Sequence, residues 1–576
     1  MYDTFRDAYF GQGLRYISGG RVCLYPEELS DFQLPQNYHI APQDHSSSSI
    51  IPSTNSPDKD SSASFEHDAK TPIEGHEDGD QLRAKHQGTD IEKNYTLEAP
   101  PSKHGTTIVT WYSETDQENP QNWSKAKKLW ISAIILLYTL SAYIGASLYT
   151  SAIPTMREMW GLSNLAVSVG LSIYVVGYGL GPMLLSPLSE IPQIGRNPPY
   201  IIGFGLFVIL CVPTALVDNF AGMLVLRFLT GFFGSPAFAS GGASFGDIYG
   251  PMQLPYAMAY WIGGASAGPA LGPLIGNYAV IGENWRWPFW ELLWLSGPVF
   301  LLMLFFLPET SSDLILLRRA RRLRKLTGRT DLMAECEIRQ QHRNRNEVLY
   351  QALIKPWEIN ILDPAVLFTT IYTGLIYGIY YSFFESFPLV FQGVYKFSLG
   401  SLGLAYLAIV IGNFAAVGVW NGYFYFVADK QISAMMAGGV VIPPETRLVP
   451  GLIATFFTPA GLFIFAWTSR ESIHWIVPLI GITTSMVSNF IIAQCMLIYL
   501  PFTYPKYASS LFAANGLSRA FLAAAAILFS TPLFENLGVA NGVTLLAGLC
   551  CGCCVGIYVL YFYGATLRKR SKFADT

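Results

Sequence analysis

Long apolar segments separated by short polar connections run through most of the chain. Each holds about 20 residues or more, the length that an α-helix needs to cross a bilayer. The segments cover residues 129–153, 165–188, 198–216, 220–245, 254–281, 286–308, 361–391, 400–427, 448–468, 474–499, 508–533 and 541–563. The pattern predicts an all-α membrane protein with twelve transmembrane helices. Because they fall as six, a long polar connection and six, we expect two pseudo-symmetric six-helix bundles.

Polar residues divide the rest of the chain. We expect a cytoplasmic tail that is largely disordered, because Ser46 to Asp80 is rich in Ser, Pro and charged residues; residues 5–35 are more apolar and can form a short amphipathic helix. The predicted parts are this N-terminal tail (1–126), a six-helix bundle (127–310), a central loop (311–358), a second six-helix bundle (359–565) and a C-terminal tail (566–576).

The central loop carries a strongly basic stretch. Between Leu314 and Leu326, leucine and isoleucine residues alternate with arginines. This pattern predicts a basic amphipathic helix that lies on the inner leaflet and is attracted to anionic lipid.

Composition and charge agree with a membrane protein. Of the 576 residues, 51% are apolar and only 13% are charged, about half the charged fraction of a soluble protein. Lys and Arg residues concentrate in connections on one side, so the positive-inside rule places both termini and the central loop in the cytoplasm. The basic residues are dispersed among apolar runs, which argues against a nucleic-acid partner.

Patterns typical of enzymes and of metal or nucleotide sites are absent from the sequence. It has no Gly-Lys-Ser/Thr phosphate-binding motif, no hydrolase triad pattern and no cysteine pairs at zinc spacing. We therefore expect neither an enzyme nor a bound cofactor or metal, and an ion gradient must supply the energy for any transport.

The segment 254–281 carries small residues at every fourth position. The pattern consists of Gly264, Gly268, Gly272 and Gly276, with Pro269 and Pro273 between them. Such a stripe lets a neighbouring helix approach closely, and the prolines remove helix hydrogen bonds and bend the segment. Ordinary helix packing is the simpler explanation of the same pattern.

Charged residues at the membrane segments form a second group of candidates. Arg227 stands inside an apolar run, where a charge is costly and is a functional candidate, although it can also be structural and paired with a polar neighbour. Glu190, Gly195 and Arg196 follow the second segment. A carboxylate and an arginine there can form a charge relay that keeps one conformation closed to the cytoplasm; the alternative is a solvated loop pair of little energetic weight.

These motifs resemble those of the major facilitator superfamily. The glycine stripe is similar to motif C of its proton antiporters, Ser186 to Arg196 to motif A with Ser186 and Glu190 in place of Gly and Asp, and Arg227 to motif B. Asn119-Pro120-Gln121-Asn122-Trp123-Ser124 and Leu307-Pro308-Glu309-Thr310 resemble fungal drug:proton antiporters of the benomyl/methotrexate- and fluconazole-resistance type. The resemblance extends roughly from Asp116 to Phe573 and implies the superfamily's fold, with Arg227 linked to proton transfer.

A proton antiporter needs a carboxylate that is reachable from both sides. Glu385, in the seventh segment, is the best candidate, and Glu291, in the sixth, is the second. Burial raises a carboxyl pKa toward the working range. Either residue can instead be an interfacial carboxylate, and Glu291 can cap the interface near the outside.

The substrate surface is expected to be aromatic and apolar with a few polar groups. The candidate binding residues come from several segments of both halves. They are Tyr178, Tyr260, Tyr377, Tyr381, Phe384, Asn489, Gln494, Asn515 and Arg519.

The sequence thus favours a monomeric proton-coupled exporter that works by alternating access. Its partners would be the lipid bilayer, protons and small hydrophobic or amphipathic molecules such as azoles, fungicides or fungal toxins and secondary metabolites. The alternative function is a proton-coupled uptake carrier for a small nutrient, against which the resemblance to motif C argues. We expect the plasma membrane, with the vacuolar membrane as the alternative.

Overall fold

The computed structural model describes residues 2–30, 32–33, 35, 38, 106–341, 350, 354–438, 443–504 and 508–571. The stretch from Ser46 to Asp80, which the sequence predicts to be disordered, lies outside these residues. The described part is almost entirely helical and contains one two-stranded sheet.

Helices of the first half follow one another with short connections. They are α3 (Lys125–Ser147), η4 (Leu148–Ala152), α4 (Ile153–Trp160), α5 (Asn164–Glu190), α6 (Asn197–Leu216), α7 (Phe220–Gly234), α8 (Pro236–Ile248), α9 (Leu254–Gly282) and α10 (Trp287–Phe306).

The second half repeats this plan with more breaks. Its helices are α14 (Lys355–Leu362), α15 (Pro364–Phe387), the π-helix η5 (Pro388–Val394), α16 (Leu399–Ala405), α17 (Leu407–Tyr423), the π-helix η6 (Phe424–Ala428), α18 (Asp429–Ala437), η7 (Pro444–Leu448), α19 (Val449–Ala454), α20 (Phe457–Thr468), α21 (Ile476–Thr503) and α22 (Ala508–Arg570).

Polar side chains at the starts of several helices satisfy backbone groups that have no partner within the helix. The Oγ of Ser124 accepts a hydrogen bond from the third residue of α3, and Ser163 does the same for α5. The Asn219 side chain begins α7, and Asp363 accepts from two backbone N–H groups at the start of α15. These caps fix where the membrane helices begin.

Nine helical stretches among the described residues are long and apolar enough to cross a membrane. The last of them, within α22, contains two predicted segments that meet at Gly538, where φ is +75° and the backbone leaves the helical region. Two predicted segments are not among the nine. The pair α7 and α8 is interrupted at Ser235, and α9 is rich in small residues and prolines.

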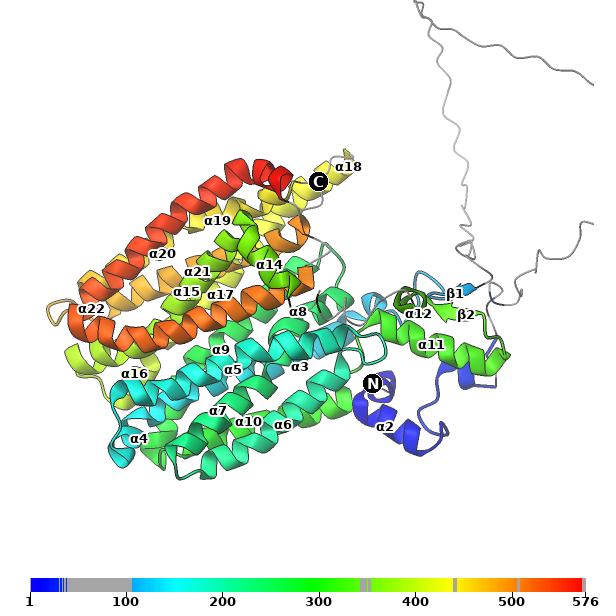
Figure 1. Ribbon diagram of the computed structural model, residues 1–576, viewed down its shortest axis with the longest axis horizontal. Coiled ribbons are helices and arrows are strands. Elements are labelled where there is room, and N and C mark those ends of the chain that lie inside the picture. The colour runs from blue at the N-terminus through cyan, green and yellow to red at the C-terminus, as the bar shows by residue number, and fades with distance from the viewer. Residues whose placement is uncertain are drawn as a thin grey trace, which may run out of the picture.

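The long helices run side by side between two ends of the molecule (Figure 1). Helices α4 and α16 lie at one end. At the other end, α18 and the last turns of α22 lie on the same side as α11 (Ser312–Thr327), α12 (Glu335–Gln341) and the N-terminal helices α1 (Tyr2–Asp7) and α2 (Tyr9–Ile17). The start of the chain, the last turns of α22 and the central connection therefore lie at the same end of the bundle.

A small subdomain forms around the central connection. Strand β1 (Thr107–Val109) pairs in parallel with β2 (Leu332–Ala334), so that a segment just before the first bundle joins one just after it. The apolar face of α11 packs against this sheet through Leu314, Leu317 and Leu323, all of which are buried. The predicted amphipathic helix is therefore present, and its apolar face is covered by protein.

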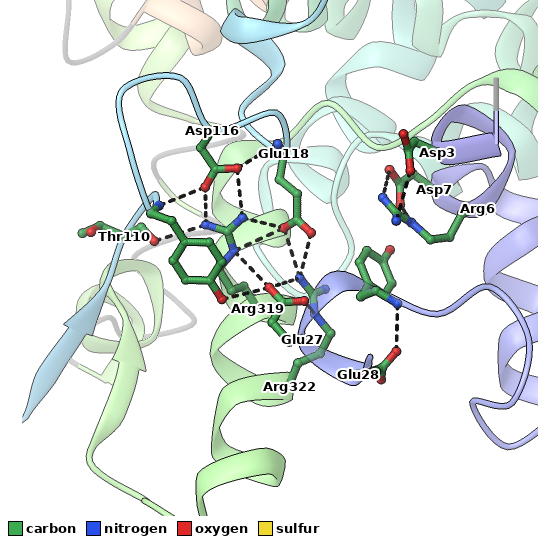
Figure 2. Close-up of polar contacts among 12 residues, drawn as sticks. Asp3, Arg6, Asp7, Glu27, Glu28, Thr110, Asp116, Glu118, Arg319 and Arg322 are labelled. Carbon is green, nitrogen blue, oxygen red and sulfur yellow. Dashed lines mark hydrogen bonds and ion pairs between the residues drawn. The ribbon is translucent and has the colours of Figure 1, made fainter. Parts of the chain in front are cut away.

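Two arginines of α11, Arg319 and Arg322, are bound by acidic residues of the N-terminal tail (Figure 2). Arg319, only 1% exposed, binds Asp116 at 2.6 Å and Glu118 at 2.9 Å. Arg322 binds Glu27 at 3.0 Å and Glu118 at 3.0 Å. The prediction that this helix lies on anionic lipid is wrong for these two arginines, because carboxylates of the same chain already neutralise them.

The environment of this ion cluster shifts the pKa values of two carboxyl groups, Asp116 and Glu118, in opposite directions. Burial would raise the pKa of Asp116, but hydrogen bonds and charge attraction from Arg319 and two backbone N–H groups hold that pKa below its usual value. Burial dominates at Glu118 and raises its pKa, despite the nearby arginines. The parts of the tail that contribute Glu27, Asp116 and Glu118 are therefore docked onto α11.

Candidate functional site

The two halves meet mainly along three pairs of helices. Helix α5 of the first half packs against α22, and α9 packs against α16 and α17. The Ser172 Oγ donates a hydrogen bond of 3.1 Å to the carbonyl of Ala524, and Asn277 donates one of 2.9 Å to the carbonyl of Leu399. These hydrogen bonds link the two halves directly.

Glu385 lies at this interface. It is near the C-terminal end of α15, toward the end of the bundle that carries α16, and is partly exposed. Its Oε1 accepts a hydrogen bond of 2.9 Å from Ser168 on α5, and its Oε2 accepts one of 3.2 Å from Thr531 on α22. The carboxyl group therefore joins the two halves through hydroxyl groups that the sequence analysis did not single out.

Arg227 is buried inside the first half, with 1% of its surface exposed. Its guanidinium donates to the carbonyl oxygens of Gly145 at 2.5 Å, Ala146 at 2.8 Å and Gly170 at 3.2 Å. It also lies over the rings of Tyr149 and Tyr174, at 4.9 and 4.3 Å. The structure thus favours the structural alternative for Arg227 in this conformation, since its partners are carbonyl oxygens rather than a carboxylate.

Helix α5 connects these two charged residues. Gly170, which accepts from Arg227, lies two residues from Ser168, which donates to Glu385. Arg227 therefore fixes the backbone of α5 beside the contact between the halves. The structure therefore links Arg227 to Glu385 only through this stretch of α5.

An aromatic cluster occupies the space between the halves. The hydroxyl groups of Tyr178 and Tyr377 are 2.7 Å apart, and Tyr178 also donates to Tyr381 at 3.2 Å. Phe384 packs against Tyr381 with ring centroids 5.6 Å apart. The structure brings together these four predicted residues from α5 and α15, and the Arg519 guanidinium lies 5.0 Å from the Tyr377 ring.

Sequence reasoning missed two members of this cluster. The rings of Tyr143 and Phe238 pack at 4.1 Å, and both lie close to Tyr178, at 5.9 and 5.1 Å. Both belong to the first half, on α3 and α8. Nothing in the local sequence separates them from the many other aromatic residues of the membrane segments.

Other predicted binding residues lie apart from the cluster or at its edge. Tyr260 is 62% exposed on the outer face of α9, and the structure does not bring it to the cluster. Asn489 binds Thr458 at 2.8 Å within the second half, where Gln494 is also buried. Asn515 donates to Thr373 at 3.0 Å and belongs to the same turn region of α22 as Arg519.

The glycine stripe of α9 faces the first membrane helix. A Cβ at Gly268 would lie 2.9 Å from Tyr143 Cβ, and one at Gly272 would lie 1.9 Å from Ser147 Oγ and 2.8 Å from the Leu148 backbone nitrogen. At Gly264 and Gly276 it would lie 2.7 and 2.6 Å from side chains of the same neighbouring helix. The close approach predicted from the small residues is therefore present, with the buried Pro269 and Pro273 between them.

At the α11 end, Arg196 pairs with a different carboxylate from the predicted one. Arg196 binds Asp247 of α8 at 3.3 Å and Ser189 at 3.2 Å. Glu190 is exposed, and within the described part of the chain no ion pair is seen between it and Arg196. The partner role predicted for Glu190 therefore belongs to Asp247, because the second segment ends with Glu190 turned toward solvent.

Glu309 organises the same region. Its carboxylate is 3% exposed and accepts hydrogen bonds from the backbone nitrogens of Arg196 and Ser311, both at 2.9 Å. Gly195, with φ of +77°, passes so close that a Cβ would lie 2.6 Å from Glu309 Oε2. The Pro-Glu-Thr sequence that resembles fungal antiporters thus joins the start of α6 to the start of α11.

Glu291 has no comparable link. It is partly buried on α10, and its Oε2 is buried without a hydrogen-bond partner among the described residues. The structure does not bring it to Arg227 or to the contact between the halves.

A helical membrane protein of two bundles, with a polar and aromatic interface between them, is the architecture of a carrier that exposes its centre to alternate sides. Residues 135–527 match the family model described as Major Facilitator Superfamily. The chain belongs to this superfamily. The predicted fold class, two bundles of membrane helices, is confirmed.

Several fungal transporters are similar to this chain over most of its length. The MFS-type transporter pyvG of Aspergillus violaceofuscus is 45% identical over 471 residues, covering 82% of this chain and 86% of the relative. Fluconazole resistance protein 1 of Saccharomyces cerevisiae is 37% identical, and the match covers 85% of this chain and 87% of the relative. The cycloheximide resistance protein of Candida maltosa is 34% identical over 99% of both chains.

Among solved structures, the proton:xylose symporter XylE has a similar fold. The TM-score is 0.54, with 12% identity, and the match covers 76% of this chain and 97% of that one. At this identity the likeness concerns the fold alone.

Proposed function

We propose that the chain is a proton-coupled exporter of small hydrophobic or amphipathic compounds. The observation that carries this proposal is the position of Glu385, a carboxylate bound at once by Ser168 of the first half and Thr531 of the second. A group that gains or loses a proton at this contact changes the strength with which the halves are held together.

The energetic reason lies in the charge of the acceptor. A hydrogen bond to an ionised carboxylate is worth about 1.5–3 kcal/mol, against about 0.5–1.5 kcal/mol for a neutral pair. Protonation of Glu385 weakens the contact with Ser168 and favours separation of the two halves at the end of the bundle that carries α16. A proton from the acidic exterior then accompanies outward release of the substrate, and deprotonation toward the cytoplasm resets the carrier.

The aromatic cluster supplies the surface for the substrate. Tyr178, Tyr377, Tyr381 and Phe384 offer apolar rings together with hydroxyl groups that can donate or accept. Such a surface suits planar and amphipathic molecules of varied shape. The names of the fluconazole- and cycloheximide-resistance relatives support drugs and fungicides as substrates.

The orientation proposed from the Lys and Arg distribution places the α11 end in the cytoplasm. The common position of α2, α11 and the last turns of α22 at that end supports two cytoplasmic termini. The resistance relatives support the plasma membrane, where export removes a compound from the cell.

The function is tested by expression in a yeast strain that lacks its own efflux pumps. Resistance and efflux are measured for fluconazole, cycloheximide and benomyl, with and without a proton uncoupler. The proposal predicts resistance and an efflux that the uncoupler abolishes. Efflux that is indifferent to the uncoupler refutes proton coupling, and accumulation of the compounds supports the uptake carrier instead.

A further inference from the structure

Arg519 on α22 has an unusual set of neighbours for a cation in the centre of a membrane protein. Its Nε is buried and has no hydrogen-bond partner among the described residues. The guanidinium lies 5.0 Å from the ring centroid of Tyr377. A ring face attracts a cation, but it does not satisfy its N–H groups.

Comparison with other arginines that are buried or partly buried makes this environment distinctive. Arg227 donates to three carbonyl oxygens, and Arg319 binds carboxylates of the tail. Arg196 binds Asp247. Arg519 differs from these arginines, because it is only partly buried and no hydrogen bond or ion pair to it is seen within the described residues.

Glu385, the carboxylate at the contact between the halves, is too far along the bundle to act as the missing partner. Thr531, which binds Glu385, stands about three turns beyond Arg519 on α22, roughly 18 Å along the helix axis at 1.5 Å per residue. Glu385 is therefore held at a different level of the bundle. A guanidinium between membrane helices that has no acceptor from the chain needs one from water or from a ligand.

The groups around Arg519 complete a site for such a ligand. Asn515, one turn earlier on α22, donates to Thr370 and Thr373, while its Oδ1 is buried without a partner. The hydroxyl groups of Tyr377 and Tyr178 lie on the neighbouring helices. The aromatic rings of the cluster are next to a cation with free donors, and this combination matches an aromatic molecule that carries an acidic group.

We propose that Arg519 binds an anionic group of the substrate, so that the exported compounds include aromatic acids or acidic enols as well as neutral molecules. This inference rests on the proposed function, since it names a substrate class for the same central site. The guanidinium presents planar, paired donors, which suit a carboxylate or a delocalised enolate. Arg519 is thus the residue that sets the preference for anionic over neutral substrates.

The test compares an aromatic anion, fluorescein, with a neutral aromatic dye, Nile red. Wild-type protein and the Arg519→Gln and Arg519→Lys variants are expressed in the pump-deficient yeast, and efflux of both dyes is followed. Arg470→Gln serves as the matched control, because Arg470 is an exposed arginine beside Trp467 outside the central site. Binding of each dye to the purified full-length proteins in detergent is measured by fluorescence.

We expect Arg519→Gln to lower the ratio of fluorescein to Nile red efflux about tenfold, with about a tenfold weaker binding of fluorescein relative to Nile red. Arg519→Lys keeps the charge and restores part of the ratio, and Arg470→Gln leaves the ratio as in wild type. In one further outcome, Arg519→Gln selectively loses fluorescein binding, but wild type exports neither dye. This outcome upholds the anion site and refutes the export function.

Two results overturn the inference. In the first, the ratio of fluorescein to Nile red efflux is the same in wild type and Arg519→Gln, because the variant either exports both dyes normally or loses export of both to the same extent. In the second, wild type binds and exports Nile red but neither binds nor exports fluorescein. Either result assigns Arg519 to packing or coupling instead of substrate recognition.

Discussion

The Oγ of Ser168 on α5 donates a hydrogen bond of 2.9 Å to Glu385 on α15, so that one half of the carrier holds a carboxylate of the other. Arg227 binds the carbonyl of Gly170 only two residues away. The buried arginine and the interfacial carboxylate therefore act on the same stretch of α5. This relationship leads to the first predictions.

Ser168→Ala removes one of the two hydroxyl groups that donate hydrogen bonds to the Glu385 carboxylate. We expect the variant to lose about 1.5–3 kcal/mol of the contact between the halves and to show weaker pH dependence of efflux. In a double-mutant cycle, Ser168→Ala and Glu385→Gln are expected to be non-additive, because both act on one hydrogen bond. Ser172→Ala is the control, since Ser172 also bonds across the halves but to the carbonyl of Ala524. Strict additivity of Ser168→Ala with Glu385→Gln contradicts the assignment.

Arg227→Lys should not preserve function despite retaining the charge. Lysine cannot reproduce the fork that reaches the carbonyl oxygens of Gly145, Ala146 and Gly170. Each hydrogen bond to the charged guanidinium that is lost costs about 1.5–3 kcal/mol. Thermal unfolding of the purified protein is expected to occur at a lower temperature, together with a loss of efflux. An Arg227→Lys protein as stable and active as wild type shows that these three contacts are dispensable.

Gly272→Ala tests the close approach of α9 and α3. The added methyl would meet Ser147 Oγ at 1.9 Å, so the helices must separate, at a cost of about 1–3 kcal/mol. We expect reduced stability and efflux. Gly297→Ala on α10 is the matched control, because nothing lies within 4 Å of its Cβ position. The packing role of the stripe is refuted if both substitutions behave alike.

Two substitutions at the α11 end compare Asp247, the observed partner of Arg196, with Glu190, the partner predicted from the sequence. Asp247→Asn removes the charge that binds Arg196 at 3.3 Å, and we expect about a tenfold loss of efflux. Glu190→Gln is expected to change efflux by less than about twofold, because Glu190 is exposed. The reverse order of effects, measured in the same yeast assay, favours the partner inferred from the sequence.

Docking of the tail onto α11 depends on pH through Asp116. Its pKa is lowered in the folded state, so the ionised carboxylate stabilises docking above the unfolded value of about 3.9. This stabilisation is lost as the pH falls through the folded-state pKa. Arg319→Ala leaves Asp116 without its arginine, while Glu27 and Glu118 keep Arg322, and should cost about 3–5 kcal/mol. Arg321→Ala, at an exposed position of the same helix, should not carry this cost. Hydrogen exchange of the amides of Thr107–Val109 reports the undocking, and equal protection in both variants argues against it.

The sequence predicted those features that depend on repeated local patterns. Segment length gave the membrane helices, and the spacing of Gly264, Gly268, Gly272 and Gly276 indicated a surface that another helix approaches. Glu385 was found because charges are rare in apolar segments. These signals are local, so one sequence is enough to reveal them.

Partners separated by long stretches of chain were not predictable in the same way. Ser168 and Thr531 are common residues of membrane helices, and only the packing of α5 and α22 brings them to Glu385. The sequence predicted that the arginines of α11 face lipid, because it does not show that Glu27, Asp116 and Glu118 pair with Arg319 and Arg322. Asp247 became the partner of Arg196 for the same reason: the end of α8 folds back beside α6.

The most direct test of proton coupling through Glu385 uses proteoliposomes with an acidic interior and a radiolabelled compound to which the chain confers resistance. Wild-type protein is predicted to accumulate the compound against its gradient until an uncoupler dissipates the pH difference. Glu385→Gln should still exchange labelled for unlabelled compound but should not accumulate it. Accumulation by Glu385→Gln that equals wild type, or wild-type accumulation that persists without the pH difference, would contradict the account.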